Sequence, residues 1–398
     1  MVVIEWRYNL TSEERHEVRY QRRKAKRLQK LADRQEAVGD LSTALSYAAL
    51  YEAGRDACKG VRWKTSTINF ELRLFSRTAA ARRKLVQNKW KSHNSCTFHL
   101  VERGHKRKID APHINDRQVH KATCRKVLRP LYYPHMIYDN GASIEGKGFS
   151  FTMDRTEYFL KWWYERYGTE GVVVTVDFKG YFPNAPHDAI ESIHEKYILC
   201  PDLRYLSGYL LNAFGPVGMA LGVETSQTEA GILPNAIDHT IKDQHQVECS
   251  ERYMDDTLFI VHTDEEADAL IDVVSSKCKE MGLKLNHSKT HKNKLSGWFK
   301  FCQWRYHLTD SGKVIKKPAR TSITTMQRKL KAWARKISAK EMTRADAQEA
   351  YGCWRAYMLQ GNSHNILRKM DRRFKKLLGC EPIVTQAKKR RKKKRKFK

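Results

Sequence analysis

One run of β-branched residues near the middle of the chain constrains the fold more than any other feature. Residues 171–176 read Gly-Val-Val-Val-Thr-Val, which is typical of a buried strand, and the run ends on Asp177. Further along, Tyr253-Met254-Asp255-Asp256 leads directly into a second strand-like run at residues 257–262. The pattern therefore predicts one carboxylate at the end of a core strand and two more at the tip of a neighbouring hairpin.

Carboxylates in this arrangement predict a site for divalent cations. Two hard cations held about 3.5–4 Å apart clamp the attacking and leaving oxygens of a phosphoryl transfer, and Mg²⁺ prefers oxygen ligands. Without a cation, three close carboxylates repel one another, which raises the pKa of at least one of them. We expect Asp177, Asp255 and Asp256 to be the catalytic residues and the ligands of two Mg²⁺ ions.

The chain carries a large positive charge. It has 75 lysines and arginines against 44 aspartates and glutamates, a formal net charge of +31. Residues 388–398 supply ten of these positive charges, so the rest of the chain retains +21. This indicates a polyanionic partner, nucleic acid first and an anionic membrane surface second. The C-terminal run is expected to be a disordered arm, either a low-specificity tail or an RNA contact through Lys388, Arg390 and Arg391.

Several other classes of protein are not expected. No apolar run is long enough to span a bilayer, and Glu5 and Arg7 interrupt the apolar N-terminus, so neither a membrane span nor a secretory signal is predicted. The nine cysteines include no Cys-x-x-Cys pair, which favours reduced thiols and a cytoplasmic location. The sixteen histidines show no zinc-ligand spacing, so any metal is expected to have oxygen ligands.

Periodicity and composition predict mixed secondary structure. A strand at residues 96–101 and a basic hairpin at 104–112 precede the central strands. A capping box of Ser226 and Glu229 predicts a helix start, and Pro234 should kink that helix. The remaining predicted helices are 12–34, 41–57, 75–85, 117–127, 155–164 and 265–282, followed by an all-helical unit of 324–337, 344–359 and 365–378.

Four blocks, taken in order, resemble a reverse transcriptase. They are Asp177-Phe178-Lys179-Gly180-Tyr181-Phe182, Leu221-Gly222-Val223-Glu224-Thr225-Ser226-Gln227, Tyr253-Met254-Asp255-Asp256, and Gly282-Leu283-Lys284-Leu285-Asn286 with Lys289 and Thr290. The resemblance implies an α+β right-hand polymerase with fingers, a palm of antiparallel sheet with packed helices, and a helical thumb. It implies RNA-directed DNA synthesis from deoxynucleoside triphosphates, with the backbone carbonyl of Phe178 assisting the three acids at the metal ions.

The resemblance also suggests domain boundaries. Residues 1–100 are expected to be a basic helical region with the start of the fingers, and 101–170 the fingers themselves. The palm is expected at 171–316, the thumb at 317–380 and the basic tail at 381–398. Since so little follows the thumb, we expect a stand-alone polymerase without a ribonuclease H or integrase module.

Further site residues follow from the same resemblance. Phe182 falls at the steric gate, where a bulky ring excludes a 2′-hydroxyl. Lys289 falls near the leaving pyrophosphate, either as a general acid or as a solvated lysine. The other expected nucleotide contacts are Lys106, Arg107, Gly222 and Gln227. The expected nucleic-acid contacts are Tyr253, Arg117, Lys147 in a Gly-Lys-Gly loop, Trp304 at the primer grip, and Arg328, Lys331 and Arg335 on the first thumb helix.

The block Leu-Gly-x-x-x-Ser-Gln resembles two bacterial branches, the diversity-generating retroelement enzymes and the defence-associated, or "unknown group", enzymes. Residues 233–239 are more similar to the second branch. We therefore expect a bacterial or phage-encoded enzyme that copies an associated structured non-coding RNA into cDNA in antiphage defence. Its partners would be that RNA, as template and scaffold, and the RNA–DNA hybrid, with an accessory protein or a second copy as further candidates.

Two alternatives stay open. The first is a diversity-generating retroelement polymerase that acts with an accessory protein. The second is a non-catalytic RNA-binding scaffold, against which the intact acids argue, because a scaffold has no need of three clustered charges.

Overall fold

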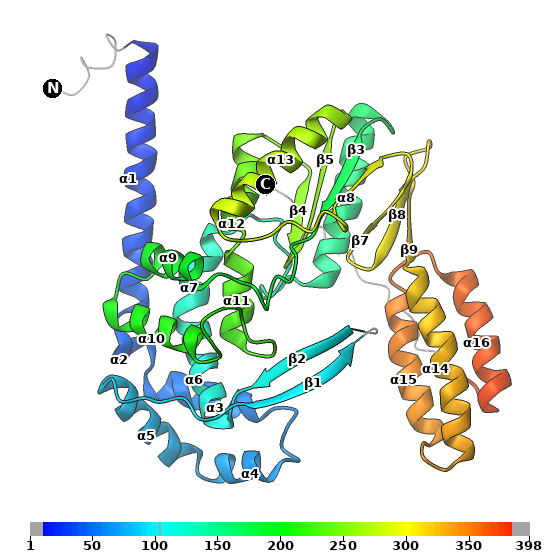
Figure 1. The fold of residues 1–398 in the computed structure, drawn as a ribbon, viewed down its shortest axis with the longest axis horizontal. Helices are drawn as coiled ribbons and strands as arrows, with labels where there is room; N and C mark the ends of the chain where they lie inside the picture. Colours follow the sequence, from blue (N-terminus) through cyan, green and yellow to red (C-terminus); the bar gives the residue numbers. More distant parts are fainter. Residues whose placement is uncertain (1–10, 103–104, 384–398) are drawn as a thin grey trace, which may run out of the picture.

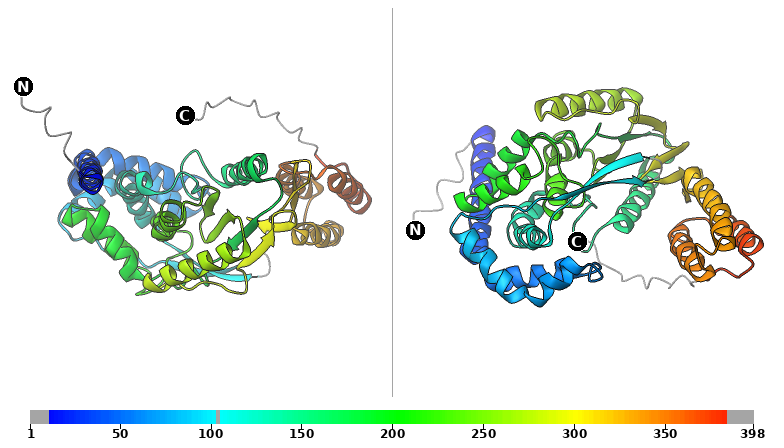
Figure 2. Two further views of the ribbon diagram at one scale, coloured as in Figure 1. Left: turned by 90° about the horizontal axis from the view of Figure 1, so that it is seen from above. Right: turned by 60° about the horizontal axis from the view of Figure 1, so that its bottom comes forward.

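The computed structural model describes residues 11–102 and 105–383. The expectations on the first seven residues and on Lys388, Arg390 and Arg391 fall outside these ranges. The chain has an α+β fold in which helices surround antiparallel sheets, and the N-terminal helices and the thumb lie at opposite ends of the molecule in every view (Figures 1 and 2). Within the described ranges no helix is both long and apolar enough to cross a membrane.

The N-terminal region is helical, as predicted. Its helices are α1 (Ser12–Val38), α2 (Leu41–Ala44), α3 (Tyr47–Cys58), α4 (Thr65–Leu72) and α5 (Leu74–Val86). A capping box of Thr11 and Glu14 begins α1. The single helix expected over 41–57 is wrong, because Ser46 caps a new helix, α3, with its side chain.

The fingers begin with an antiparallel hairpin of β1 (Cys96–Glu102) and β2 (His105–Ala111). The strand expected at 96–101 is confirmed. The hairpin expected within 104–112 is wrong, because residues 105–111 form a single strand that pairs with β1. It leads into α6 (Ile114–Thr123), the π-helix η2 (Cys124–Leu128), α7 (Arg129–Tyr132), the 3₁₀-helix η3 (Tyr133–His135) and α8 (Phe149–Tyr167).

The palm is built on a four-stranded antiparallel sheet in the order β4 (Ser250–Tyr253), β5 (Asp256–Val261), β3 (Val172–Val176), β6 (His291–Lys294). Alternate residues of β3 pack into two different hydrophobic clusters, one on each face of the sheet. Val172, Val174 and Val176 pack with α11 and α13, whereas Val173 packs with α8. Because both faces are covered, the strand is continuously hydrophobic rather than alternating. The palm helices are α9 (His187–Tyr197), α10 (Pro201–Asn212), α11 (Glu224–Ile232), α12 (Asn235–His239), η4 (Thr240–Gln244) and α13 (Asp264–Glu280).

A second sheet joins the palm to the thumb. It consists of β7 (Trp298–Phe301), β8 (Trp304–Leu308) and β9 (Val314–Pro318), in that order. The thumb follows as α14 (Arg320–Ser338), α15 (Arg344–Met358) and α16 (His364–Leu378), packed around Leu330, Tyr351 and Phe374 (Figure 1). The three thumb helices were predicted, whereas this sheet and helices α4, α9 and α10 were not.

The expected capping box at Ser226 is wrong. Helix α11 begins two residues earlier, at Glu224, and its N-cap Val223 makes no side-chain cap. Ser226 and Glu229 are buried within the helix, and the Glu229 carboxylate lies 3.4 Å from the His194 imidazole rather than at the helix end. The effect of Pro234 is confirmed: α11 ends at Ile232 and α12 begins at Asn235.

Candidate active site

The first acid, Asp177, follows directly on β3 and is held by one residue from the loop before β6. The backbone N–H of Asn286 donates to the Asp177 carbonyl at 2.8 Å, and its side-chain amide donates to the Asp177 carboxylate at 2.7 Å. The Lys289 ammonium lies 3.3 Å from both carboxylate oxygens and is 64% exposed. In this structure Lys289 therefore contacts Asp177, and its expected position near the leaving pyrophosphate stays a prediction.

The other two acids lie at the β4–β5 turn, as predicted. Met254 adopts a left-handed conformation with φ of 56°, which is uncommon for a residue with a side chain. The guanidinium of Arg252 donates to the Met254 carbonyl at 3.0 Å and to the Gly231 carbonyl at 2.7 Å. It also forms a bidentate pair with Asp238 at 2.7–2.8 Å, and the Arg252 side chain has no exposed surface. This buried pair fixes the turn that carries Asp255.

The environment of the hairpin acids disfavours negative charge. Burial, followed by the negative charges of Asp255 and Asp177, raises the pKa of Asp256 to about 7. Burial and the charge of Asp177 also raise the pKa of Asp255. The three acids are thus close enough to interact, and the positive charges of Lys289, Arg107 and Lys300 oppose these shifts.

The metal ligation expected of Asp177, Asp255 and Asp256 stays a prediction. Among residues 11–102 and 105–383, no three His, Cys, Asp or Glu side chains are arranged as a metal-binding group. The Asp177 carboxylate instead contacts Asn286 and Lys289. The donor set still fits a hard cation, since all three ligands are carboxylates whose mutual repulsion a bound cation would relieve.

Lys106 and Arg107, the two basic side chains predicted to contact the nucleotide, lie on different faces of the fingers hairpin. Side chains alternate along β2, so Lys106 and Arg107 lie on opposite faces. Arg107 is near enough to Asp255 for its positive charge to oppose the rise in the pKa of that acid. On the Arg107 face, Ile109 lies 3.5 Å from where a Cβ of Gly222 would stand, and Gly222 has a φ of +102°. The glycine therefore allows the loop before α11 to approach the hairpin, and only Arg107 of the pair faces the acids.

The predicted gate, Phe182, follows the buried Tyr181 in the segment after Asp177. Phe182 is half-buried and lies edge-on to Tyr181, with ring centroids 5.7 Å apart. The buried Tyr181 hydroxyl donates to the Ala230 carbonyl at 2.6 Å, which anchors this segment to α11. Gln227 is exposed on α11. The Phe178 ring packs in the palm core, and Phe178 forms an isolated antiparallel β-bridge with Leu285. Among the backbone hydrogen bonds of the described residues around this bridge, the Phe178 carbonyl is not an acceptor.

One predicted nucleic-acid contact is wrong. Trp304 has no exposed surface and packs in the core between α8 and the second sheet, so its side chain cannot contact nucleic acid. The preceding Cys302 and Gln303 form a tight turn with positive φ values of 45° and 67°.

The other predicted nucleic-acid contacts lie in differing surroundings. The Lys147 ammonium donates to the Tyr138 carbonyl at 2.5 Å and lies over the Tyr138 ring. Arg117 is half-buried on α6. Tyr253 packs edge-on against Phe149. Arg328, Lys331 and Arg335 are exposed on α14.

Sequence reasoning missed the residues that hold the site together. They include Asn286, the Arg252–Asp238 pair and Glu224. The Glu224 carboxylate accepts from Lys121 at 2.5 Å and from Arg129 at 2.6 Å, which joins the fingers helices to α11. Arg252 precedes the Tyr-Met-Asp-Asp segment in a polar stretch, so no local pattern in the sequence marked its buried pair with Asp238.

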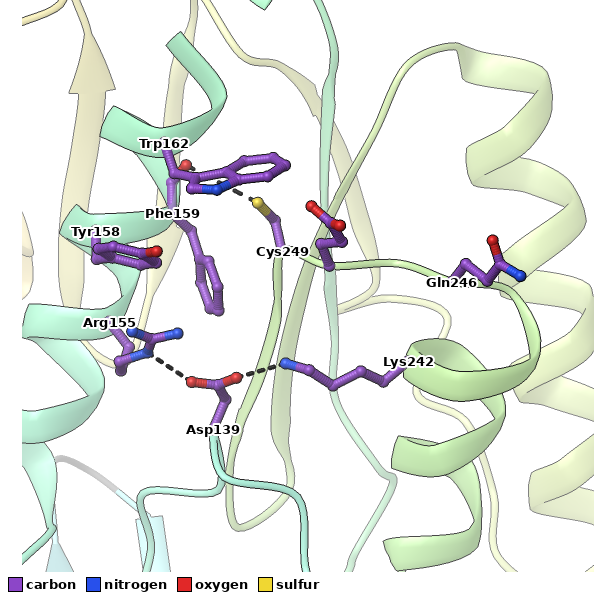
Figure 3. Close-up of a pocket in the computed structure, with 9 residues that line it drawn as sticks. Asp139, Arg155, Tyr158, Phe159, Trp162, Lys242, Gln246 and Cys249 are labelled. Carbon is purple, nitrogen blue, oxygen red and sulfur yellow. Dashed lines mark hydrogen bonds and ion pairs between the residues drawn. The ribbon is translucent and has the colours of Figure 1, made fainter. Parts of the chain in front are cut away.

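A separate hollow of about 520 Å³ lies between α8 and the segment 242–249 (Figure 3). Asp139 pairs there with both Arg155 and Lys242, and rings of Tyr158, Phe159 and Trp162 complete the wall. None of the predicted site residues lines it.

A carboxylate at the end of a central strand, two at the adjoining hairpin turn, a basic fingers hairpin and a helical thumb together define a right-hand nucleic-acid polymerase. Residues 91–301 match the family of reverse transcriptases, described as RNA-dependent DNA polymerases. The chain belongs to this reverse transcriptase family.

Solved telomerase structures are similar to the chain. For telomerase from Candida tropicalis without its C-terminal domain, the identity is 14% and the TM-score 0.45, over 56% of this chain and 55% of that one. For telomerase from Candida albicans with a fragment of telomeric RNA, the identity is 12% and the TM-score 0.44, over 74% and 58%. The chain thus spans between half and two thirds of the length of these telomerases. No curated protein matches the chain in sequence.

Proposed function

We propose that the protein extends a DNA strand on an RNA template, using two Mg²⁺ ions and deoxynucleoside triphosphates. The observation that carries the proposal is the strand register, which pairs Val176 of β3 with Thr257 of β5 and so brings Asp177 beside Asp255 and Asp256 at the β4–β5 turn. A bound cation would relieve the repulsion among these carboxylates, and phosphoryl transfer uses such cations.

Metal binding, triphosphate binding and sugar selection would fall to different residues of the chain. Asp177, Asp255 and Asp256, with the backbone carbonyl of Phe178, would hold the ions, which neutralise charge on the attacking and leaving oxygens. Arg107 faces the acids from the hairpin and would contact the triphosphate. Phe182 would exclude a 2′-hydroxyl.

Lys289 would have two roles, to balance the charge of Asp177 and to donate a proton to the leaving group. Its ammonium balances Asp177 before substrate binds. It would donate a proton to the leaving group once a cation takes over that balancing role.

We propose further that the template is an associated structured RNA and that the biological role is antiphage defence. The net charge of +21 outside the tail supports an RNA partner. The Leu-Gly-x-x-x-Ser-Gln block supports the bacterial placement, and it equally favours a diversity-generating retroelement enzyme as the second candidate.

The test is to purify the protein from its native cell and sequence the RNA and DNA that it retains. An Asp255→Ala, Asp256→Ala variant is compared with a matched control, Glu195→Ala, Asp202→Ala, which removes two exposed carboxylates from α9 and α10. We expect the wild type and the control variant to retain one dominant RNA together with DNA complementary to it. The Asp255→Ala, Asp256→Ala variant should lack that DNA. Complementary DNA that persists in the first variant would refute catalysis by these acids and favour the scaffold.

A further inference from the structure

The loop between α10 and α11 is bonded to the segment that carries Phe182. The backbone N–H of Met219 donates to the Phe182 carbonyl at 2.7 Å, and the N–H of Gly218 donates to the Ala185 carbonyl at 2.9 Å. Gly218 has a φ of +87°, and a Cβ at this position would stand 2.6 Å from the Pro183 carbonyl oxygen. Glycine allows both the backbone conformation and the close approach. The backbone at the predicted gate is therefore held by residues 218 and 219.

His187 joins this contact to α10. It is the first residue of α9, and its side chain is buried. Its Nε2 lies 2.7 Å from the Gly218 carbonyl oxygen, and its Nδ1 lies 2.8 Å from the side-chain oxygen of Asn212, the last residue of α10. The ring thus connects the two ends of the loop 213–218.

Both atoms that face the His187 ring are acceptors. A backbone carbonyl has no hydrogen to donate, so Nε2 must donate to Gly218. The Asn212 amide nitrogen already donates to the Gly208 carbonyl at 2.9 Å and to the Glu191 carboxylate at 3.0 Å, which leaves its oxygen to face Nδ1. The ring that makes both bonds must therefore donate from both nitrogens, as only the imidazolium form does. Such charge-assisted hydrogen bonds are stronger than neutral ones.

The same loop continues to the fingers. Four residues beyond Gly218, Gly222 allows the chain to approach Ile109 of the hairpin. The loop therefore contacts the gate segment at one end and the fingers at the other. Because Phe182 would exclude a 2′-hydroxyl by direct contact, its effect depends on where its backbone lies. A displacement of about 1 Å is enough to change the rate of an enzymatic step about 100-fold.

We infer that His187 is a positioning residue for sugar selection. By bonding to Gly218 it holds residues 218 and 219 against the backbone of residues 182–185, and so fixes how far the Phe182 ring reaches toward the sugar of the incoming nucleotide. The inference rests on the proposed function, because it takes Phe182 to be the gate.

The experiment compares primer extension by full-length protein with a deoxynucleotide and with the matching ribonucleotide. The measured quantity is the ratio of the two kcat/KM values. His187→Ala should lower this preference for the deoxynucleotide about tenfold, because a displaced ring leaves room for the 2′-hydroxyl. His194→Ala is the matched control, since it removes another buried imidazole from α9 that lies beside Glu229. A purely structural loss would slow the use of both nucleotides equally and leave the ratio unchanged.

Chemical rescue separates hydrogen bonding from the filling of space. Free imidazole added to the His187→Ala protein should restore most of the ratio, because its protonated form donates from both nitrogens. 1-Methylimidazole carries a methyl group on one nitrogen and should restore little. Equal rescue by the two compounds would overturn the requirement for two donors. His187→Gln keeps an amide donor and more of the side-chain volume, so it should give an intermediate ratio even where the alanine variant folds poorly.

Hydrogen exchange follows the loop without synthesis. Measured by mass spectrometry over residues 215–223, the amides of Gly218 and Met219 should lose protection in His187→Ala and keep it in His194→Ala.

The results separate the inference from the proposed gate. A lower ratio together with lost protection in His187→Ala supports the inference. A ratio that is unchanged in His187→Ala but lowered in Phe182→Ala overturns it. If Phe182→Ala also leaves the ratio unchanged, or if the wild type extends no primer, the proposed function fails at that point. Lost protection then leaves His187 as the residue that holds the loop, and retained protection overturns that role as well.

Discussion

The buried Arg252–Asp238 pair gives a prediction with two separable readouts. Asp238→Asn removes the charge that compensates a guanidinium with no exposed surface. Breaking a buried pair by removing one partner costs about 3–5 kcal/mol, because the remaining charge stays buried. Since domains of this kind are stable by about 5–15 kcal/mol, the loss should be plain in urea unfolding followed by circular dichroism.

Replacing both partners distinguishes stability from positioning. Asp238→Leu with Arg252→Met removes both charges, and such replacements are neutral or stabilising by about 1–4 kcal/mol. The Met254 carbonyl nevertheless loses its donor, so the turn that carries Asp255 is no longer fixed. We expect near-normal unfolding but at least tenfold slower primer extension. Glu280→Gln, which breaks the exposed pair with Lys277, is the control and should change stability by less than about 1 kcal/mol.

Two results would refute this reasoning. An Asp238→Asn protein that unfolds within about 1 kcal/mol of the wild type would show that the guanidinium is compensated in another way. A double variant that extends primers at the wild-type rate would show that Arg252 stabilises the palm without positioning the turn.

Four shorter predictions follow. Phe182→Ala should raise ribonucleotide incorporation at least tenfold relative to deoxynucleotides in primer extension, with an unchanged ratio counting against the gate. Asn286→Ala should slow extension more than tenfold, because Asp177 loses its amide donor, while costing only about 1 kcal/mol in urea unfolding. Glu224→Ala should cost about 1.5–3 kcal/mol in the same assay, because two charged donors lose their acceptor, and a loss below about 0.5 kcal/mol would contradict its joining role. Burial lowers the pKa of His120 to about 4. The unfolded state then binds more protons below pH about 6.5, so stability should fall by about 2–4 kcal/mol between pH 6.5 and 4, and His120→Gln should flatten that dependence in urea unfolding.

Local patterns in the chain predicted much of the fold and the place of the acids. The β-branched run before Asp177 predicted β3, and the acids at residues 255 and 256 predicted a hairpin tip, because both features depend on neighbouring residues. The Ser226 capping box failed for the opposite reason. Its motif is local, but Ser226 and Glu229 are buried within a helix that begins at Glu224, and Glu229 lies beside His194 of α9, far away in the chain.

The sequence by itself determined the family, the order of the catalytic blocks and the excess of positive charge. These are properties of residue identity and spacing, which do not depend on how the chain folds. Only the tertiary structure decided that Asn286 holds Asp177, that Trp304 is buried, and that His187 holds Gly218. Each of these depends on strand register or on contacts between segments far apart in the chain, and a one-residue change of register would turn Trp304 out of the core.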